Sequence, residues 1–366
     1  MMSKKPSENK QAFHKRLIDD AREAGFKRTL KQDFRDIYDF YIDKETRARL
    51  ASMSRFRRWI RVAYYILKNL LLKLSPIRRL LLVISLIFAL SVQSLSAGNA
   101  SIDINLKLLA YLTILIVLLL ELKDKLLAKD ELAAGRAVQM ALMPDASPEF
   151  PGWDIWLHTQ PANDVGGDLV DSIPLSEDRL AIVIGDVSGK GLGAALFSTR
   201  LQATIRALAP TIASTTKLGA HLNDIFCRDC LPQFFATLVY LEFSAKQEVR
   251  FINAGHMPPF LVRDGIVHEL EQGDPALGIM PKTKYAEKRL KIEPGEMLCF
   301  YSDGVSEARN EEGDFFGEER LSKNLLANAQ QSAEHIGAAI LQAVEAFIGH
   351  ARVSDDLSLV VLKRTS

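Results

Sequence analysis

Two long apolar runs separate the N-terminal part of the chain from the rest. Residues 80–97, LLLVISLIFALSVQSLSA, contain no charge, and residues 108–120, LLAYLTILIVLLL, form a second run that Leu106 and Leu122 extend. A helix that spans a bilayer core needs about twenty predominantly apolar residues, with a lower limit near seventeen. The first run therefore predicts a spanning helix, and the second predicts one if Lys107 extends toward the lipid headgroups.

The charges around the two runs predict their orientation. Arg78 and Arg79 precede the first run, the polar connection at 98–105 contains one acid and no base, and Lys123, Lys125 and Lys129 follow the second run. Because basic residues concentrate in cytoplasmic loops, the pattern predicts a two-pass helical hairpin in the cell membrane with both termini in the cytoplasm. The alternative is a helical hairpin buried in a soluble domain, since the second run is short.

The segments that flank the predicted hairpin are rich in charge. Residues 1–79 carry 21 basic and 9 acidic residues, and between 55 and 73 the bases alternate with aromatic and apolar side chains at helical intervals. This pattern is typical of a basic amphipathic helix on an anionic lipid surface, so the lipid bilayer is the expected partner and a nucleic-acid-binding patch the disfavoured alternative. Residues 123–144 predict a linker helix, either a tether packed on the next domain or a short coiled coil that joins two copies.

From residue 145 to 366 the pattern changes to strand-like runs interleaved with pairs of helical segments. This order predicts one α+β domain with sheets covered by helices. Three cysteines, Cys227, Cys230 and Cys299, are too few for a disulfide framework and indicate a reducing compartment. The CxxC at 227–230 has no second ligand pair at a spacing suited to zinc, so ordinary buried thiols are favoured over a metal or redox site.

Acidic residues recur at the ends of the predicted strands. Asp168 follows a Gly-Gly pair, Asp186 ends the run AIVIGD, Asp303 ends MLCFYSD, and Asp355 and Asp356 precede LSLVVL. Carboxylates that converge from several strands repel one another unless divalent cations neutralise them, and all-oxygen ligands select Mg²⁺ or Mn²⁺ over zinc. Each aspartate taken singly is also compatible with an ordinary turn.

Eight segments in a fixed order carry a resemblance to a known family. Together they resemble the bacterial PP2C-type (PPM) serine/threonine phosphatases of the SpoIIE/RsbU group, from about residue 134 to the C-terminus. The segments are QMALMP (139–144), PANDVGGDLVD (161–171), GDVSGKG (185–191), FATLVYLEF (235–243), NAGHMPP (253–259), FYSDGVSEARN (300–310), FFGEERL (315–321) and DDLSLVVL (355–362).

The resemblance implies an α-β-β-α sandwich and a site with two Mn²⁺ or Mg²⁺ ions. A water that bridges the ions would attack the phosphorus, with no phosphoenzyme and with Asp168, Asp186 and Asp303 as the catalytic carboxylates. Asp355 is favoured over Asp356 as the direct ligand in the final motif. The implied metal ligands are Asp168, Asp186, the Val187 carbonyl, Asp303, and Asp355 or Asp356.

Two residues near the implied site are weaker candidates for substrate binding. Lys190 is a candidate for contact with the substrate phosphate, although a solvated loop lysine is the favoured interpretation. His256 is a candidate to orient its loop or donate a proton, although a hydrogen-bonded structural histidine is the favoured interpretation. The segment 185–193 lacks the spacing of a P-loop and is not interpreted as a nucleotide site.

These observations predict four regions and one activity. The chain is expected to be a metal-dependent protein serine/threonine phosphatase, tethered to the bacterial inner membrane and active on a phosphorylated STAS-type anti-sigma-factor antagonist in a partner-switching pathway. A homodimer through the linker helix is left open as the assembly, and no nucleic-acid partner is expected.

The alternatives to the phosphatase activity are a non-enzymatic phosphoprotein-binding regulator and a phosphohydrolase of small nucleotides. The regions are 1–79 (basic amphipathic), 80–122 (hairpin), 123–144 (linker) and 145–366 (phosphatase).

Overall fold

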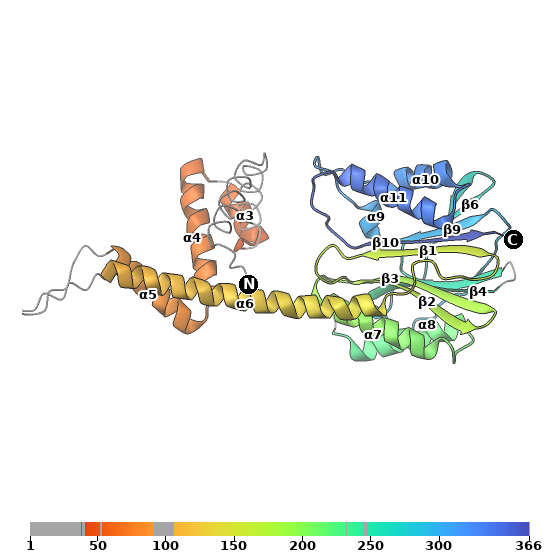
Figure 1. Cartoon of the computed structure of the whole chain (residues 1–366), viewed down its shortest axis with the longest axis horizontal. Helices are drawn as coiled ribbons and strands as arrows, with labels where there is room; N and C mark the ends of the chain where they lie inside the picture. The colour runs from red at the N-terminus through yellow and green to blue at the C-terminus, as the bar shows by residue number, and fades with distance from the viewer. Residues whose placement is uncertain are drawn as a thin grey trace, which may run out of the picture. The chain divides into compact units, whose positions relative to one another are not determined.

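The chain divides into two compact units in its computed structural model. The structure describes Tyr38 and residues 41–51, 53–90, 106–231, 233–244 and 248–365. The units are Met1–Leu126 and Leu127–Ser366, and each is described by itself (Figure 1).

The first unit is helical in its described part. Helix α4 occupies the segment with alternating basic and apolar residues, and its Phe56 and Trp59 side chains are 77% and 75% exposed. Arg78 pairs with Glu121 and Asp124, each at 2.7 Å, and so joins two helices of this unit. The helices are α3 (Lys44–Ala51), α4 (Arg55–Lys73), α5 (Pro76–Leu90) and the part of α6 (Leu106–Leu142) up to Leu126.

The predicted two-pass hairpin at 80–122 is wrong. Among the helices that the structure describes, none combines the length with the apolar composition that crossing a bilayer needs. α5 has 15 residues, and the uncharged stretch of α6 is bounded by Lys107 and Glu121. Residues 91–105, which hold the end of the first predicted span and the polar connection, lie outside the described residues. The inner-membrane location and the orientation of the termini depended on these spans and are withdrawn, whereas the lipid surface as partner of the segment 55–73 stays a prediction.

The second unit contains two five-stranded antiparallel sheets. The first sheet has the order β1-β10-β9-β6-β7, formed by β1 (Trp153–Gln160), β10 (Leu357–Arg364), β9 (Met297–Tyr301), β6 (Phe260–Arg263) and β7 (Ile266–Glu269). The second has the order β2-β3-β4-β5-β8, formed by β2 (Asp168–Ser176), β3 (Arg179–Val187), β4 (Ala236–Ser244), β5 (Glu248–Ala254) and β8 (Lys288–Lys291).

Helices cover the outer face of each sheet, as Figure 1 shows. α7 (Leu192–Leu208) and α8 (Thr215–Asp229) pack on the second sheet, and α10 (Gly317–Asn328) and α11 (Ala333–Ile348) lie on the side of the first. The short α9 (Asp303–Ser306) follows β9. The predicted α-β-β-α sandwich is therefore confirmed.

Burial on both faces explains why the strand runs are continuously apolar. In β3, Leu180, Ile182 and Ile184 belong to the core cluster between the two sheets. The alternate residues Ala181 and Val183 belong to the cluster beneath α7 and α8. Because successive side chains of a strand point to opposite faces, a strand covered on both sides needs apolar residues at every position. This packing fixes the strand ends, where the acidic residues lie.

The contact between α11 and the first sheet yields a stability prediction. A Cβ on Gly337 would lie 2.1 Å from two atoms of the Trp156 ring. We expect Gly337→Ala to lower the free energy of unfolding by about 1–3 kcal/mol, since the helix must move away from the ring. Gly135→Ala in α6, whose Cβ would meet Val165 at an ordinary 3.9 Å, is the matched control and should not destabilise the chain. Urea unfolding followed by circular dichroism measures both, and equal stability of the two variants would contradict the prediction.

Candidate functional site

One edge of the sandwich gathers the five aspartates from both sheets. Asp168 begins β2 and lies opposite Asp186 of β3 in the strand register. Asp303 follows β9, and Asp355 and Asp356 precede β10, which pairs with β9. The carboxylates are close enough to interact electrostatically, since the charges of Asp303, Asp355 and Asp356 raise the pKa of Asp186. Residues far apart in the sequence thus form one acidic cluster.

Glycines allow the backbone segments of this edge to approach closely. A Cβ on Gly166 would lie 2.4 Å from Oδ2 of Asp356, and one on Gly304 would lie 1.9 Å from the carbonyl oxygen of Asp356. A Cβ on Gly167 would lie 2.8 Å from the carbonyl oxygen of Val187, which places that oxygen beside the cluster. Glycine is therefore required before Asp168 and after Asp303, because a side chain there would clash with the neighbouring backbone or carboxylate.

Asp356 holds the turn that presents Asp168. Its Oδ1 accepts a hydrogen bond from the amide of Ala162 at 2.8 Å, and its Oδ2 accepts from the amides of Gly167 at 2.7 Å and Asp168 at 3.2 Å. Ser358 Oγ donates to Asp168 Oδ2 at 2.5 Å. Both oxygens of Asp356 thus accept hydrogen bonds from backbone amides. The side chain connects the residue before β10 of the first sheet to the start of β2 in the second sheet.

Asp355 has a different environment from its neighbour. Its Oδ2 lies 2.8 Å from Nζ of Lys190, and its side chain is 42% exposed. Lys190 also donates to the carbonyl oxygen of Ser354 at 2.6 Å. The contrast favours Asp355 as the residue of this pair that faces a ligand, although its role as direct metal ligand stays a prediction. Lys190 is not a free loop lysine, because it is paired with an acid of the cluster.

Burial and mutual repulsion raise the pKa values of the clustered carboxyls. Burial first, and then the charges of Asp303, Asp355 and Asp356, raise the pKa of Asp186 to about 7. The pKa of Asp168 is raised well above its usual value, first by burial and then by the charge of Asp186. The pKa of Asp303 is also raised, mainly by burial and then by Asp355. The folded chain therefore holds negative charges that a cation would stabilise.

The donor set of this edge fits a hard divalent cation. Its donors are carboxylate and carbonyl oxygens, which suit Mg²⁺ or Mn²⁺. Within the described part of the chain, no three His, Cys, Asp or Glu side chains stand arranged to hold a metal ion by themselves. Mg²⁺ typically keeps several waters and takes one or two carboxylates from the protein, so the acidic cluster is compatible with such an ion.

His256 lies behind the acidic cluster. It is 5% exposed, and its Nδ1 is 2.9 Å from Oγ1 of Thr237. Burial lowers the pKa of His256 to about 4. This arrangement does not favour the predicted contact between His256 and substrate, because the ring is buried. Thr237 was not identified from the sequence, since its place beside Asp186 depends on the register between β3 and β4.

The end of α6 binds the glycine turn through a second residue that sequence reasoning did not single out. Gln139 Nε2 donates to the carbonyl oxygen of Gly166 at 2.9 Å, and its Oε1 accepts from the Gly166 amide at 3.2 Å. The sequence does not indicate this role of Gln139, since a glutamine on a helix is usually solvated. Gln139 therefore fixes the turn from outside the sheets.

Removal of the Gln139 amide should loosen this turn. We expect Gln139→Ala to lower the free energy of unfolding by about 1–2 kcal/mol, because two hydrogen bonds to one backbone position are lost. Val138→Ala, one position earlier on α6 and 58% exposed, is the control and should change it by less than about 0.5 kcal/mol. Urea titrations provide the measurement, and an unchanged midpoint for Gln139→Ala would count against the role of the contact.

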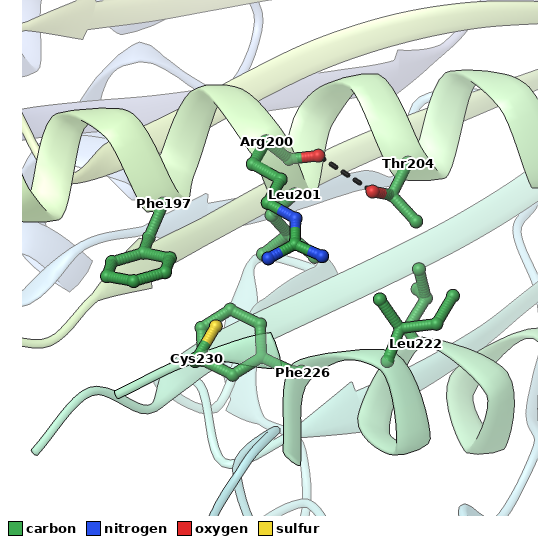
Figure 2. Close-up of a pocket in the computed structure, with 8 residues that line it drawn as sticks. Phe197, Arg200, Leu201, Thr204, Leu222, Phe226 and Cys230 are labelled. Atoms are coloured by element: carbon green, nitrogen blue, oxygen red, sulfur yellow. Dashed lines mark hydrogen bonds between the residues drawn. The ribbon is translucent and has the colours of Figure 1, made fainter. Parts of the chain in front are cut away.

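An apolar pocket between α7 and α8 offers no comparable chemistry. Phe197, Leu222, Phe226 and Cys230 are among its lining residues, and the oxygen of Arg200 accepts a hydrogen bond from Thr204 Oγ1 (Figure 2). Burial raises the pKa of the Cys230 thiol, which makes it a poor nucleophile. Cys227, Cys230 and Cys299 are free; Cys299 is buried, whereas Cys227 and Cys230 are only partly buried, in contrast to the predicted buried thiols.

Comparison with known proteins identifies relatives for the C-terminal unit. Residues 176–365 match the family Stage II sporulation protein E (SpoIIE). The chain is similar to Protein IcfG of Synechocystis sp. (33% identity, covering 64% of this chain and 41% of IcfG) and to phosphoserine phosphatase RsbU of Bacillus subtilis (27%, covering 64% and 70%). The fold is similar to the SiaA-PP2C domain of Pseudomonas aeruginosa, with a TM-score of 0.57 and 21% identity over 66% of this chain and 99% of that domain. The family match covers more than half of this chain, and the fold is that of a PP2C domain. The chain therefore belongs to the SpoIIE family and has a PP2C-type phosphatase fold.

Proposed function

We propose that this chain is a metal-dependent protein serine/threonine phosphatase that hydrolyses phosphoserine or phosphothreonine. The observation that carries the proposal is the cluster of Asp168, Asp186, Asp303 and Asp355 at one sandwich edge, where the pKa values of the first three are raised. Membership of the SpoIIE family and the similarity to a protein named phosphoserine phosphatase support it.

The residues of the cluster would divide the work of the site. Asp168, Asp186, the Val187 carbonyl, Asp303 and Asp355 would hold two Mn²⁺ or Mg²⁺ ions. When bound, such ions lower the pKa of water and neutralise charge on phosphoryl oxygens. Asp168 and Asp186 lie at the ends of paired strands, and Asp303 begins α9 just after β9, so these three carboxylates would be held near the reacting phosphate.

Two other residues would support the carboxylates. Asp356 fixes the Gly167 and Asp168 amides and keeps the first carboxylate in place. The Lys190 side chain is 58% exposed beside Asp355, so its ammonium can also contact an oxygen of the incoming phosphate.

The proposed substrate is a phosphorylated STAS-type anti-sigma-factor antagonist. This proposal rests on the SpoIIE/RsbU resemblance and on the relatives reported above, of which the chain spans between 41% and 70% of the length. A non-enzymatic phosphoprotein-binding regulator would have lost acids of the cluster, whereas all five are present. A phosphohydrolase of small nucleotides remains the rival activity that the experiment must exclude.

A homodimer through the linker helix is the proposed assembly. Leu127 and Val138 of α6 are 52% and 58% exposed, which suits pairing with a second copy. The rival role of the linker, a monomeric tether, predicts a single-chain mass in light scattering at all concentrations.

Turnover assays discriminate between these activities. The purified chain is incubated with a phosphoserine STAS-domain protein, a phosphoserine peptide and a nucleoside triphosphate, each with Mn²⁺ or with EDTA. We expect phosphate release from the phosphoproteins only in the presence of Mn²⁺, and little release from the nucleotide. Binding of the phosphoprotein without release, or preferred release from the nucleotide, would overturn the proposal.

A further inference from the structure

His256 occupies a buried position next to Thr237, beneath the strand end that carries Asp186. The residue follows β5 of the second sheet, and its neighbour Met257 packs against the core of the first sheet. The ring therefore lies where the two sheets meet beneath the acidic cluster. A histidine that binds substrate would be exposed to solvent, so the buried position of His256 indicates another role.

One ring nitrogen is connected to the backbone of Asp186. Thr237 lies opposite Asp186 in the register of β3 and β4. Its Oγ1 is 2.9 Å from His256 Nδ1, 3.3 Å from the Asp186 amide nitrogen and 3.4 Å from the Asp186 carbonyl oxygen. A threonine hydroxyl can donate and accept, so it transmits the position of the ring to the strand end at Asp186.

The other ring nitrogen, Nε2, is buried and has no hydrogen-bond partner among the described residues. The backbone of Tyr301, two residues before Asp303, is near enough to the ring to act on its pKa. With its pKa lowered by burial, the ring is neutral near pH 7 and offers one donor and one acceptor.

The loop that bears His256 is held by hydrogen bonds from Asn253 and by a close backbone approach at Gly255. Asn253 Oδ1 accepts from the His256 amide at 2.8 Å, and Asn253 Nδ2 donates to the His256 carbonyl oxygen at 3.1 Å. Gly255 has φ of +70°, and a Cβ there would lie 2.8 Å from the Ala276 nitrogen. The segment 253–256 is thus closed by its own hydrogen bonds, which hold the backbone of His256 in place.

We propose that His256 is a positioning residue, which acts through Thr237 to hold the strand end that carries Asp186 in place for a divalent-metal centre. The inference rests on the proposed function, because the position of Asp186 matters only if its carboxylate holds metal. Residues that orient metal ligands from behind typically change metal affinity 10–100-fold when they are removed.

Metal binding by paired variants tests this role. His256→Leu and Thr237→Val remove the contact, whereas His256→Asn keeps an amide near the Nδ1 position and Thr237→Ser keeps the hydroxyl. Free Mn²⁺ is measured by electron paramagnetic resonance without substrate, and the unfolding of each metal-free variant is recorded beside it. We expect the first two variants to bind Mn²⁺ at least about tenfold more weakly, and the two conservative variants to stay within about threefold of the wild type.

The double variant separates positioning from a general loss of packing. If both residues act along one connection, His256→Leu with Thr237→Val should bind Mn²⁺ no more weakly than the worse single variant. Wild-type affinity in Thr237→Val, equal loss in Thr237→Ser, or additive losses would overturn the inference alone. A wild type that binds Mn²⁺ but releases no phosphate from phosphoserine would overturn the proposed function alone. A wild type that binds no Mn²⁺ would overturn both.

Discussion

Asp186→Asn is expected to reduce the kcat/KM for a phosphoserine substrate by about a thousandfold or more at saturating Mn²⁺. A metal ligand of this kind contributes several kcal/mol of charge stabilisation in the transition state, and about 4 kcal/mol corresponds to a factor of a thousand. The amide has nearly the same shape as the carboxyl, so the strand register of Asp186 with Asp168 and Thr237 should persist. Phosphate release under pseudo-first-order conditions measures the effect.

An acid at the opposite end of the same strand provides the control. Asp178 precedes β3, is exposed and accepts a hydrogen bond from Ser176 Oγ at 2.8 Å. Asp178→Asn should leave kcat/KM within about twofold, since surface substitutions of this type have small effects. If Asp186→Asn keeps more than a tenth of the wild-type kcat/KM while folded, the carboxylate does not hold the metal that drives the reaction.

The acidic cluster was predictable because its residues are marked by local pattern. Asp186 and Asp303 end apolar runs and stand beside glycine, and such a run defines a strand and its end without knowledge of its neighbours. The partners of these acids carry no such mark. Thr237 lies beside Asp186 through the β3–β4 register, and Gln139 reaches Gly166 from a helix 27 residues away. Register and packing between separate segments arise only in the folded chain.

The N-terminal expectation failed for a related reason. An apolar run indicates burial, but its length alone does not fix what covers it or where its helix ends. The helix that contains residues 108–120 continues through Glu121, Lys123 and Asp124 to Leu142. Charged residues that were interpreted as flanks of a span are therefore part of one helix, and Glu121 and Asp124 bind Arg78.

The affinity of the chain for Mn²⁺ is expected to fall steeply as the pH falls below about 7. Burial and neighbouring carboxylates raise the pKa of Asp186 to about 7 in the metal-free folded chain. Below this pH the carboxyl holds a proton that the metal must displace, so each proton released costs about tenfold in apparent affinity per pH unit. Calorimetric titration with Mn²⁺ between pH 8 and pH 5.5 should show this slope and the release of protons.

The same shift predicts the opposite trend for the stability of the metal-free chain. An unfolded aspartate has a pKa near 3.9. Between about pH 4 and pH 7 the folded Asp186 therefore binds a proton that the unfolded residue does not, and the unfolding free energy in EDTA should rise as the pH falls from 8 to 5.5. Mn²⁺ at a hundred times its Kd should add about 2.7 kcal/mol at pH 8, and the same metal concentration should add less at pH 5.5.

Asp186→Asn isolates this contribution, because asparagine does not titrate. The difference in unfolding free energy between the wild type and the variant in EDTA should shrink as the pH falls from 8 to 5.5, with the variant the more stable at pH 8. Urea unfolding at four pH values, with EDTA or Mn²⁺, supplies all the comparisons. A pH-independent difference would mean that Asp186 is ionised at ordinary acidity in the folded chain. The cluster would then not concentrate the negative charge on which a divalent-metal centre depends.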